Sequence, residues 1–460
     1  MDAWAIRIVT AALHFGAGLA LLRASVLLLE VDALASEIGY EQERQHPTRP
    51  TQLEQQKQPE RTPADPHGVT EADTATAVAT QESVDTPPTS TLSLHSSLAS
   101  TSQSRVLGCC LSTLLYVVHP MHVEVVAWPS AQPYALAALF AHLSLVFYLQ
   151  KMKAALQSTR SKQCVKGGNY DRISSSRFDA NHLAALGALG TFADRVAWSS
   201  VCVLLPTSFL LLDALVFYET QPPPATANAQ SLARGIARCA AQKIGFFAAL
   251  LASGAIALWS NEYGAKVDTD ALSLTPTERL LKCLATPAWT ARQLLWPARL
   301  RVHFQLRDGD LDLFRNLELL LSIMALAVCG AVGMWRLQQR QSPHLLLALL
   351  YFCAMLLPVS GLVQHGIVTQ GCARYAYFPS TVLVPFGGRA LARLCFAASS
   401  ATGARYRVFA AYLAVLCALV RIATLQMETW RDEKTLYAHS LRCVSASAHV
   451  RASFLPETLL

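Results

Sequence analysis

The stretch HPMHVE, which begins at His119, gathers two imidazoles and a carboxylate at the end of an apolar run. His119 and His122 are three residues apart, so a helix would place them on one face, with Glu124 within the next turn. Ionisable groups at the end of a span are candidates for function because a membrane makes them costly. Phosphate positioning, proton transfer and divalent-ion binding all stay open, as does a helix terminus with solvated polar residues. Zinc sites prefer other spacings, so we assign no metal ligand.

A second group lies in GLVQHGIVTQGCARYAYFPS. Gln364 and His365 end one apolar run, and Arg374, Tyr375 and Tyr377 open the next. The guanidinium of an arginine offers a fork of donors that suits a phosphate. The alternative is an arginine that snorkels to the interface beside a belt of aromatic residues. We expect both groups to open into one watery hollow on the same side of a membrane.

Two further ionisable residues lie alone inside apolar runs. Asp213 is expected to have a structural role near a helix end, with a proton path as the alternative. His14 is expected to make a hydrogen bond between helices, with a role in a site as the alternative. The 12 cysteines include no CxxC pair and lie mostly in apolar runs, which argues against a zinc site or a disulfide framework.

The composition indicates what must position these residues. Hydrophobic residues make up 52% of the 460 residues and charged residues only 15%, against roughly 25% in a typical soluble chain. Apolar blocks of about 20 residues match the thickness of a bilayer. A soluble enzyme, a coiled coil and a wholly disordered chain are excluded, and open sheets cannot face lipid. We predict an all-α polytopic membrane protein.

About ten transmembrane helices are expected. Their predicted bounds are 3–22, 106–127, 130–150, 182–194, 196–218, 243–261, 314–335, 344–363, 375–395 and 407–425. The fourth is too short to cross alone and is expected to form a hairpin with the fifth.

The chain divides by composition into six parts. They are a first span at 1–31, a disordered cytosolic insertion at 32–104, membrane core at 105–218, a cytosolic linker at 219–242, further membrane core at 243–426, and an amphipathic C-terminal segment at 427–460. The insertion is rich in Gln, Glu, Thr, Ser and Pro, a composition that cannot bury enough apolar surface to fold. Within 276–300, tryptophans and leucines alternate with basic residues, which predicts interfacial helices.

The basic residues set the expected orientation. The net charge is +7, and the basic residues lie between the apolar blocks, so they indicate topology rather than nucleic-acid binding. The basic loop at 151–181 should be cytosolic, which places both polar groups and the C-terminus on the opposite side. Met1 then also lies on the non-cytosolic side, as expected if a further span precedes it.

Several motifs, in their serial order, resemble the transmembrane and tetratricopeptide-repeat family of protein O-mannosyltransferases and its bacterial relatives. They are TAALHFGAGLALL (10–22), HPMHVEVVAW (119–128), RQLLWPARL (292–300), LLPVSGLVQHG (356–366), RYAYFP (374–379) and WRDEKTLYAHSLR (430–442). The last precedes lumenal tetratricopeptide repeats in that family, so 427–460 would be the truncated start of that region.

This resemblance implies a C-type membrane glycosyltransferase fold in the endoplasmic reticulum membrane. The implied activity is transfer of mannose from dolichyl-phosphate-mannose, a lipid-linked donor, to Ser/Thr of secretory-pathway proteins. The family's catalytic acids lie in a loop before its second span, which this sequence does not contain, so no catalytic base is assigned. No other cofactor is assigned; a divalent cation and membrane lipid are the remaining ligands considered.

The sequence departs from the family pattern at several polar anchors. Ala373 stands where an Asp often precedes Arg-Tyr-x-Tyr, and Ser130-Ala131-Gln132-Pro133 replaces a charged stretch. Two alternatives to an active transferase therefore stay open. One is a polytopic secondary transporter, and the other is a non-catalytic membrane adaptor of the same family.

Overall fold

The computed structural model describes 3–45, 90–163, 204–220, 274–297, 310–339, 341–362, 371–397 and 402–445, with a few isolated positions between them. All regular elements in these ranges are helical. The longer ones are α1 (Ala3–Gln45), α3 (Ser90–Val117), α5 (Gln132–Gln163), α7 (Leu205–Thr220), α10 (Pro276–Leu295), α11 (Leu317–Gln338), α12 (His344–Leu356), α13 (Leu383–Ala397), α14 (Thr402–Thr429) and α15 (Glu433–Ser445). The all-α prediction is confirmed for the described residues.

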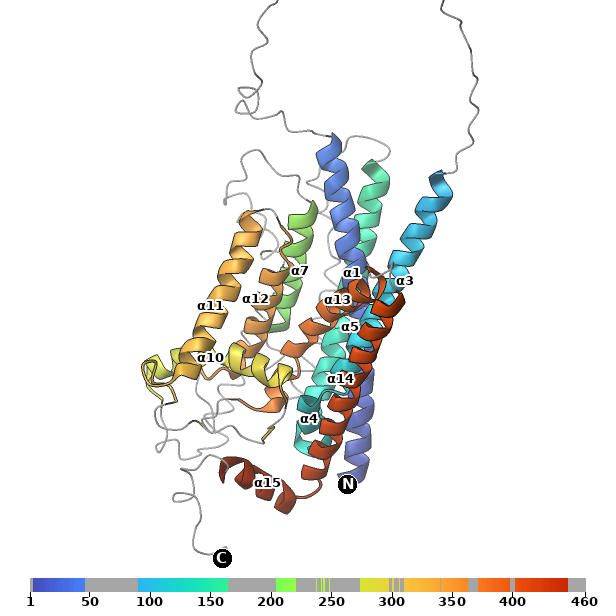
Figure 1. Cartoon of the computed structure of the whole chain (residues 1–460). Helices are drawn as coiled ribbons and strands as arrows, with labels where there is room; N and C mark the ends of the chain where they lie inside the picture. Colours follow the sequence, from blue (N-terminus) through green and yellow to red (C-terminus); the bar gives the residue numbers. More distant parts are fainter. Residues whose placement is uncertain are drawn as a thin grey trace, which may run out of the picture.

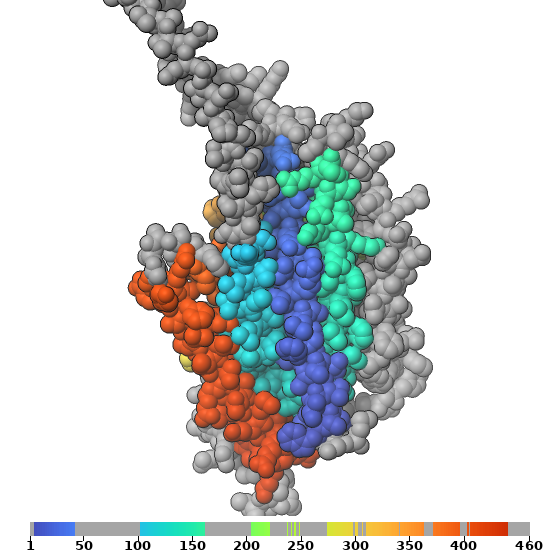
Figure 2. Space-filling view, turned by 90° about the vertical axis from the view of Figure 1, so that its right-hand side faces the viewer, coloured from blue at the N-terminus to red at the C-terminus, as the bar shows by residue number. Residues whose placement is uncertain are grey.

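The helices form an elongated bundle around α1 (Figure 1). α1 packs most extensively against α5, and α13 against α3. Figure 2 shows α1 as a ridge between α3 and α5, with α14 beside α3. Small buried residues on both partners, including Ala17, Ala24, Ala138 and Ala141, let α1 and α5 approach closely.

Contact between α3 and α13 is closer still, because two glycines meet there. A Cβ added to Gly108 would lie 2.1 Å from the carbonyl oxygen of Gly388. Any side chain at Gly108 would therefore push the two helices apart. This contact fixes α13 beside α3, and so fixes the segment before α13 that carries Arg374.

Four helical segments are long and apolar enough to cross a membrane. They are Trp4–Glu41, Pro129–Ser161, Leu317–Gln338 and Arg405–Thr429. A fifth crossing is formed if the pair Ser102–Val117 and Pro120–Ala127, bent by 52°, acts as one span. α11 and α14 leave many large apolar side chains exposed, as suits contact with lipid. A membrane protein is therefore indicated.

The predicted count of ten spans is not reached in the described residues. The spans expected at 182–194 and 243–261 lie almost wholly outside them, and the one expected at 196–218 is seen as α7. The span predicted at 344–363 is a short helix, α12, that continues only as the 3-10 turn η5 (Leu357–Val359).

The prediction of one continuous span at 375–395 is wrong. Two 3-10 segments, η6 (Ala373–Ala376) and η7 (Pro379–Val382), precede α13. Pro379 has no N–H to donate, and the hydroxyl of Ser380 donates to the Tyr377 carbonyl at 3.0 Å. These local bonds replace the regular helical pattern and hold a polar, irregular segment next to Arg374.

The predicted bounds of the disordered insertion at 32–104 are also wrong. α1 continues without a break to Gln45, and α3 already begins at Ser90. Residues 46–89 lie outside the described residues. α1 extends past its apolar part because its polar end pairs with α5: Glu30 with Lys153 at 2.8 Å, and Glu37 with Arg160 at 2.9 Å.

The bundle has two ends that matter for function. α4 (Val123–Ala127), α10 and α15 lie at one end, named here the α4 end (Figure 1). Arg7 near the start of α1 joins this end, donating to the carbonyls of Ala127 at 3.1 Å and Trp430 at 2.9 Å. The opposite end, where α7 finishes at Thr220 and α12 begins at His344, is named the α7 end.

Candidate functional site

Glu124 and Arg374 form a buried ion pair at the α4 end. Nη1 of Arg374 contacts Oε1 of Glu124, and the backbone N–H of Arg374 donates to Oε2 at 3.0 Å. The Glu124 side chain is only 2% exposed, and the Arg374 side chain 12%. Both carboxylate oxygens are thus bound by one residue, through its side chain and its backbone.

Local sequence explains why these groups meet. Pro120 begins a 3-10 turn (η1, Pro120–His122) that ends α3, and α4 then turns Glu124 toward the bundle. Arg374 lies on the short segment η6, which precedes α13. Because α13 is packed closely on α3, the two motifs are held at the same end.

Aromatic rings flank the Arg374 guanidinium. Its central carbon lies 5.1 Å from the centre of the Trp128 ring and 4.9 Å from that of Tyr375, distances suited to cation–π attraction. Burial alone would lower the pKa of Arg374, but the carboxylate of Glu124 outweighs burial and raises that pKa above its ordinary value. The guanidinium therefore stays charged.

His14, His122 and Tyr377 form a buried polar network behind this pair. Nε2 of His14 donates to the Val117 carbonyl at 2.9 Å, so its Nδ1 accepts from the Tyr377 hydroxyl at 2.6 Å. Nδ1 of His122 donates to the Tyr116 carbonyl at 2.7 Å. His14 thus joins α1 to α3, and His122 joins the end of α3 to η7 through its Nε2, which lies 3.3 Å from the hydroxyl of Ser380. The hydrogen bond between helices predicted for His14 is confirmed.

His119 connects α10 to the site. Its Nε2 donates to the carbonyl of Leu294 at 3.0 Å, and its Nδ1 accepts from the backbone N–H of Met121 at 3.3 Å. Thus one imidazole caps the turn η1 and also binds the last turn of α10, an amphipathic helix with the capping box of Thr275 and Glu278 at its start. The prediction of a helix within 276–300 is confirmed.

The two sequence groups converge as predicted. The structure brings together His119, His122, Glu124, Arg374, Tyr375 and Tyr377. Gln364 and His365 lie outside the described residues. The expected watery hollow is not seen at the pair itself, because Glu124 and Arg374 are buried against each other and against aromatic rings.

Comparisons with family models, with curated proteins and with solved structures find no match. The site's chemistry must therefore be argued from its own residues.

Lys282 is a further charged residue at the α4 end that the sequence motifs did not single out. It lies on α10 with 6% exposure, and its ammonium packs against Gly361, where an added Cβ would be 2.3 Å from Nζ. Gly361 has a φ of 86°, which favours glycine. Burial lowers the pKa of Lys282. No acceptor for this ammonium is found among the described residues.

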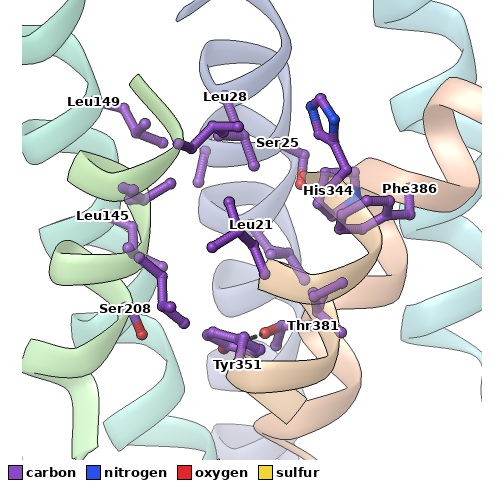
Figure 3. Close-up of a pocket in the computed structure, with 18 residues that line it drawn as sticks. Leu21, Ser25, Leu28, Leu145, Leu149, Ser208, His344, Tyr351, Thr381 and Phe386 are labelled. Atoms are coloured by element: carbon purple, nitrogen blue, oxygen red, sulfur yellow. Dashed lines mark hydrogen bonds between the residues drawn. The ribbon is translucent and has the colours of Figure 1, made fainter. Parts of the chain in front are cut away.

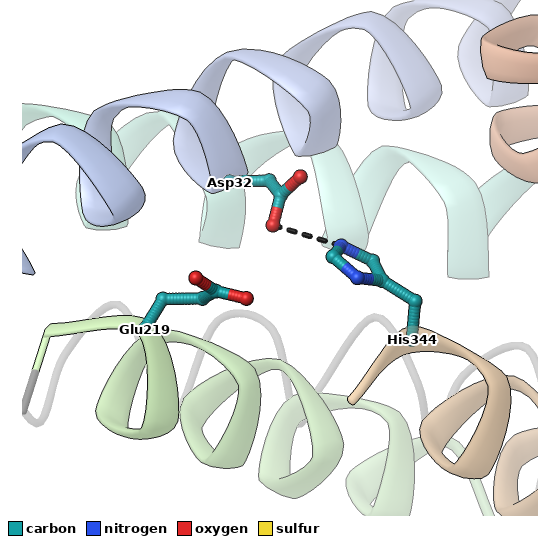
Figure 4. Close-up of side chains that lie close together, drawn as sticks. All are labelled: Asp32, Glu219 and His344. Carbon is teal, nitrogen blue, oxygen red and sulfur yellow. Dashed lines mark hydrogen bonds and ion pairs between the residues drawn. The ribbon is translucent and has the colours of Figure 1, made fainter. Parts of the chain in front are cut away.

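A polar cluster at the α7 end was also missed. Asp32 of α1, Glu219 of α7 and His344 of α12 face one another (Figure 4), and Arg389 of α13 joins them. They come from different helices and lie far apart in the sequence, so no local motif marks the cluster. Asp213, one turn and a half earlier on α7, pairs with Lys243, as its expected structural role requires.

An apolar cavity of about 120 Å³ lies beside this cluster, among α1, α5, α7, α12 and α13 (Figure 3). Leucine is the commonest residue in its wall, and His344 lies at its edge. The hydroxyl groups of Tyr351 and Thr381 bind each other at 2.8 Å, so they offer little to a polar guest. A cavity of this size and polarity suits an apolar group better than water.

Proposed function

We propose that this chain is the membrane part of a glycosyltransferase that transfers mannose from dolichyl-phosphate-mannose to Ser/Thr hydroxyls on the lumenal side of the endoplasmic reticulum. The observation that carries the proposal is the pairing of Glu124 with Arg374 at the α4 end. Two motifs that resemble those of protein O-mannosyltransferases, about 250 residues apart, contribute one residue each.

Arg374 is proposed to bind the phosphate of the donor. A guanidinium has five N–H groups, and here one contacts Glu124 while Nη2 lies 3.5 Å from the Tyr375 hydroxyl. The remaining donors can bind phosphate oxygens. Glu124 is a positioning residue, since its carboxylate fixes the arginine through both side chain and backbone. Trp128 and Tyr375 would contact the sugar or the first isoprene units.

The proposed reaction is an inverting displacement. The acceptor hydroxyl oxygen bonds to the anomeric carbon of mannose as the bond from that carbon to the phosphate oxygen breaks. The phosphate leaves with the electron pair, and Arg374 stabilises its charge. The acceptor proton passes to a base that we do not assign.

A non-catalytic adaptor is the second candidate, and one observation favours it. Glu124 already neutralises Arg374, and both are nearly inaccessible. If the pair never opens, it only holds the motifs together, and the exposed face of α15 would serve to bind partners. Binding of the donor lipid separates these two candidates, because an adaptor does not need it.

The test is mannosyl transfer from radiolabelled dolichyl-phosphate-mannose by the full chain in lipid nanodiscs, with binding of the donor measured in parallel. Arg374→Gln should reduce transfer at least 100-fold and weaken donor binding, while Arg374→Lys keeps part of both. Arg315→Gln is the matched control, since Arg315 is exposed and pairs only with its neighbour Asp312. If the chain binds the donor but does not transfer mannose, Arg374 is still assigned to the donor site, but the proposed enzymatic activity is wrong. Absence of both overturns the proposal.

A further inference from the structure

Asp32, Glu219 and His344 come from three different helices and lie together at the α7 end (Figure 4). One potential ligand atom from each lies within 4.8 Å of the other two. Oδ1 of Asp32 and Nε2 of His344 are 2.8 Å apart. Ligands that each sit about 2.0–2.2 Å from a zinc-sized ion are roughly 3–3.5 Å from one another, so this pair needs to separate by only about half an ångström to bind one. Rotation about the side-chain bonds of Glu219 can bring in the third.

The charges of this cluster balance only if His344 carries a proton. Asp32 and Glu219 contribute two carboxylates, and Asp32 is only 2% exposed. The fixed cation is Arg389, whose Nη2 lies 2.9 Å from Oδ2 of Asp32. Glu219 accepts from the hydroxyl of Ser36 at 3.0 Å, a neutral donor. With His344 neutral, the four groups carry a net charge of −1, and a cation would stabilise them.

Hydrogen bonds at His344 provide a second, independent argument. Its Nε2 lies 2.8 Å from Oδ1 of Asp32, which only accepts, and 3.0 Å from Nη1 of Arg389, which only donates. One ring nitrogen cannot serve both partners, because it either carries a proton or offers a lone pair. A cation that binds both Nε2 and the carboxylate would resolve the conflict, after side-chain movements that open the 2.8 Å contact between them.

Hydroxyl groups next to the cluster orient two of its side chains as metal ligands. Nδ1 of His344 contacts the hydroxyl of Ser342. If Nδ1 donates to that hydroxyl, Nε2 is left with the lone pair that a metal needs, which is the usual arrangement of a ligating histidine. The bond from Ser36 orients the carboxylate of Glu219 in the same way.

We propose that Asp32, Glu219 and His344 bind one divalent transition-metal ion, of the class of Zn²⁺ or Mn²⁺. One imidazole with two carboxylates favours these ions over Ca²⁺ and Mg²⁺, which prefer oxygen ligands alone. Arg389 then remains on the outer oxygen of Asp32. This proposal is independent of the transferase reaction, because the site lies at the other end of the bundle.

The test uses the full chain in detergent, carrying no polyhistidine tag and stripped with EDTA. Calorimetric titration with Zn²⁺ and visible absorption with Co²⁺ are both measured. The wild-type chain should bind one equivalent, and His344→Gln should bind at least 100-fold more weakly. Glu37→Gln is the matched control. It removes a carboxylate from α1, the helix that carries Asp32, but this carboxylate pairs with Arg160 at the surface.

Glu219→Gln provides a second measurement in case a change at the buried Asp32 or at His344 prevents folding, since Glu219 is only half-buried. This substitution should weaken the binding of Zn²⁺ at least 10-fold and change the visible absorption spectrum of bound Co²⁺. Failure of the wild-type chain to bind either ion overturns the proposal. So does binding that both His344→Gln and Glu219→Gln leave unchanged, because the ion then sits elsewhere.

Discussion

The two ends of the bundle solve the same problem, a buried carboxylate, in different ways. At the α4 end, Arg374 binds both oxygens of Glu124, the backbone of Ala373 adds a further hydrogen bond, and the side chains of Arg374 and Glu124 are 12% and 2% exposed. At the α7 end, Asp32 shares Arg389, which is 35% exposed, with His344. The first arrangement has all its partners; the second has a histidine nitrogen with two incompatible partners and a second acid close by. A fully paired group is fixed in place, whereas an incompletely neutralised one can still bind a cation.

The largest expected effect breaks the pair at the α4 end. Arg374→Met leaves the Glu124 carboxylate buried without a cation, and we expect a loss of about 3–5 kcal/mol in the free energy of unfolding. Chemical unfolding in detergent measures it. The double variant Glu124→Leu/Arg374→Met should lose much less, because an apolar pair replaces an ionic one. Equal losses in single and double variants would contradict the role of the ion pair.

The equivalent change at the α7 end should cost less. Arg389→Met removes the cation from Asp32, but solvent reaches Arg389, and Nε2 of His344 still lies 2.8 Å from the Asp32 carboxylate. We therefore expect a loss of about 1–2 kcal/mol in the free energy of unfolding, measured by the same chemical unfolding. If Arg389→Met costs as much as Arg374→Met, the two ends do not differ as argued.

A smaller effect tests the network behind the α4 end. Tyr377→Phe removes the hydroxyl that donates to Nδ1 of His14 and leaves that nitrogen buried without a donor. The free energy of unfolding should fall by about 1–2 kcal/mol. Binding of dolichyl-phosphate-mannose should be unchanged, because the aromatic ring remains. Tyr406→Phe is the control, since that tyrosine lies on the exposed surface of α14. Thermal unfolding followed by circular dichroism distinguishes the two variants.

The two ends also differ in how far they could be predicted. HPMHVE and RYAYFP are compact motifs at predicted span ends, and the predicted topology placed them on the same side of a membrane. The structure brings the two motifs into contact through Glu124 and Arg374. The burial of Glu124 could not be predicted, because it depends on the close contact between α3 and α13 at Gly108. The break before α13 could be suspected from Pro379 alone, yet the apolar run around it favoured one long span.

The α7 cluster could not be found from local sequence. The sequence predicts that Asp32 begins a disordered insertion, because the residues that follow it are mostly polar. Glu219 and His344 are isolated, and only the packing of α7 and α12 on α1 brings them together. Each helix contributes only one residue to the cluster, so the sequence contains no characteristic spacing from which the cluster could be predicted.

The smallest expected effect has the opposite sign and concerns Lys282, a charge at the α4 end with no acceptor among the described residues. Burial lowers its pKa, so the folded chain releases this proton at a lower pH than the unfolded chain, whose lysine has a pKa of about 10.4. Below the folded pKa both states are protonated and the cost of burying the charge is present in full. As pH rises toward 10.4 only the unfolded state still binds the proton, so the free energy of unfolding increases.

Lys282→Met should therefore stabilise the chain near neutral pH by about 1 kcal/mol, and this gain should shrink between pH 7 and pH 10. Arg279→Met, one turn earlier on α10, is the control, because Arg279 already donates to the Leu274 carbonyl at 3.0 Å. A loss of stability in Lys282→Met at pH 7 would show that the ammonium has an anionic partner. The α4 end would then hold a second bound charge, and its contrast with the α7 end would rest on Glu124 and Arg374 alone.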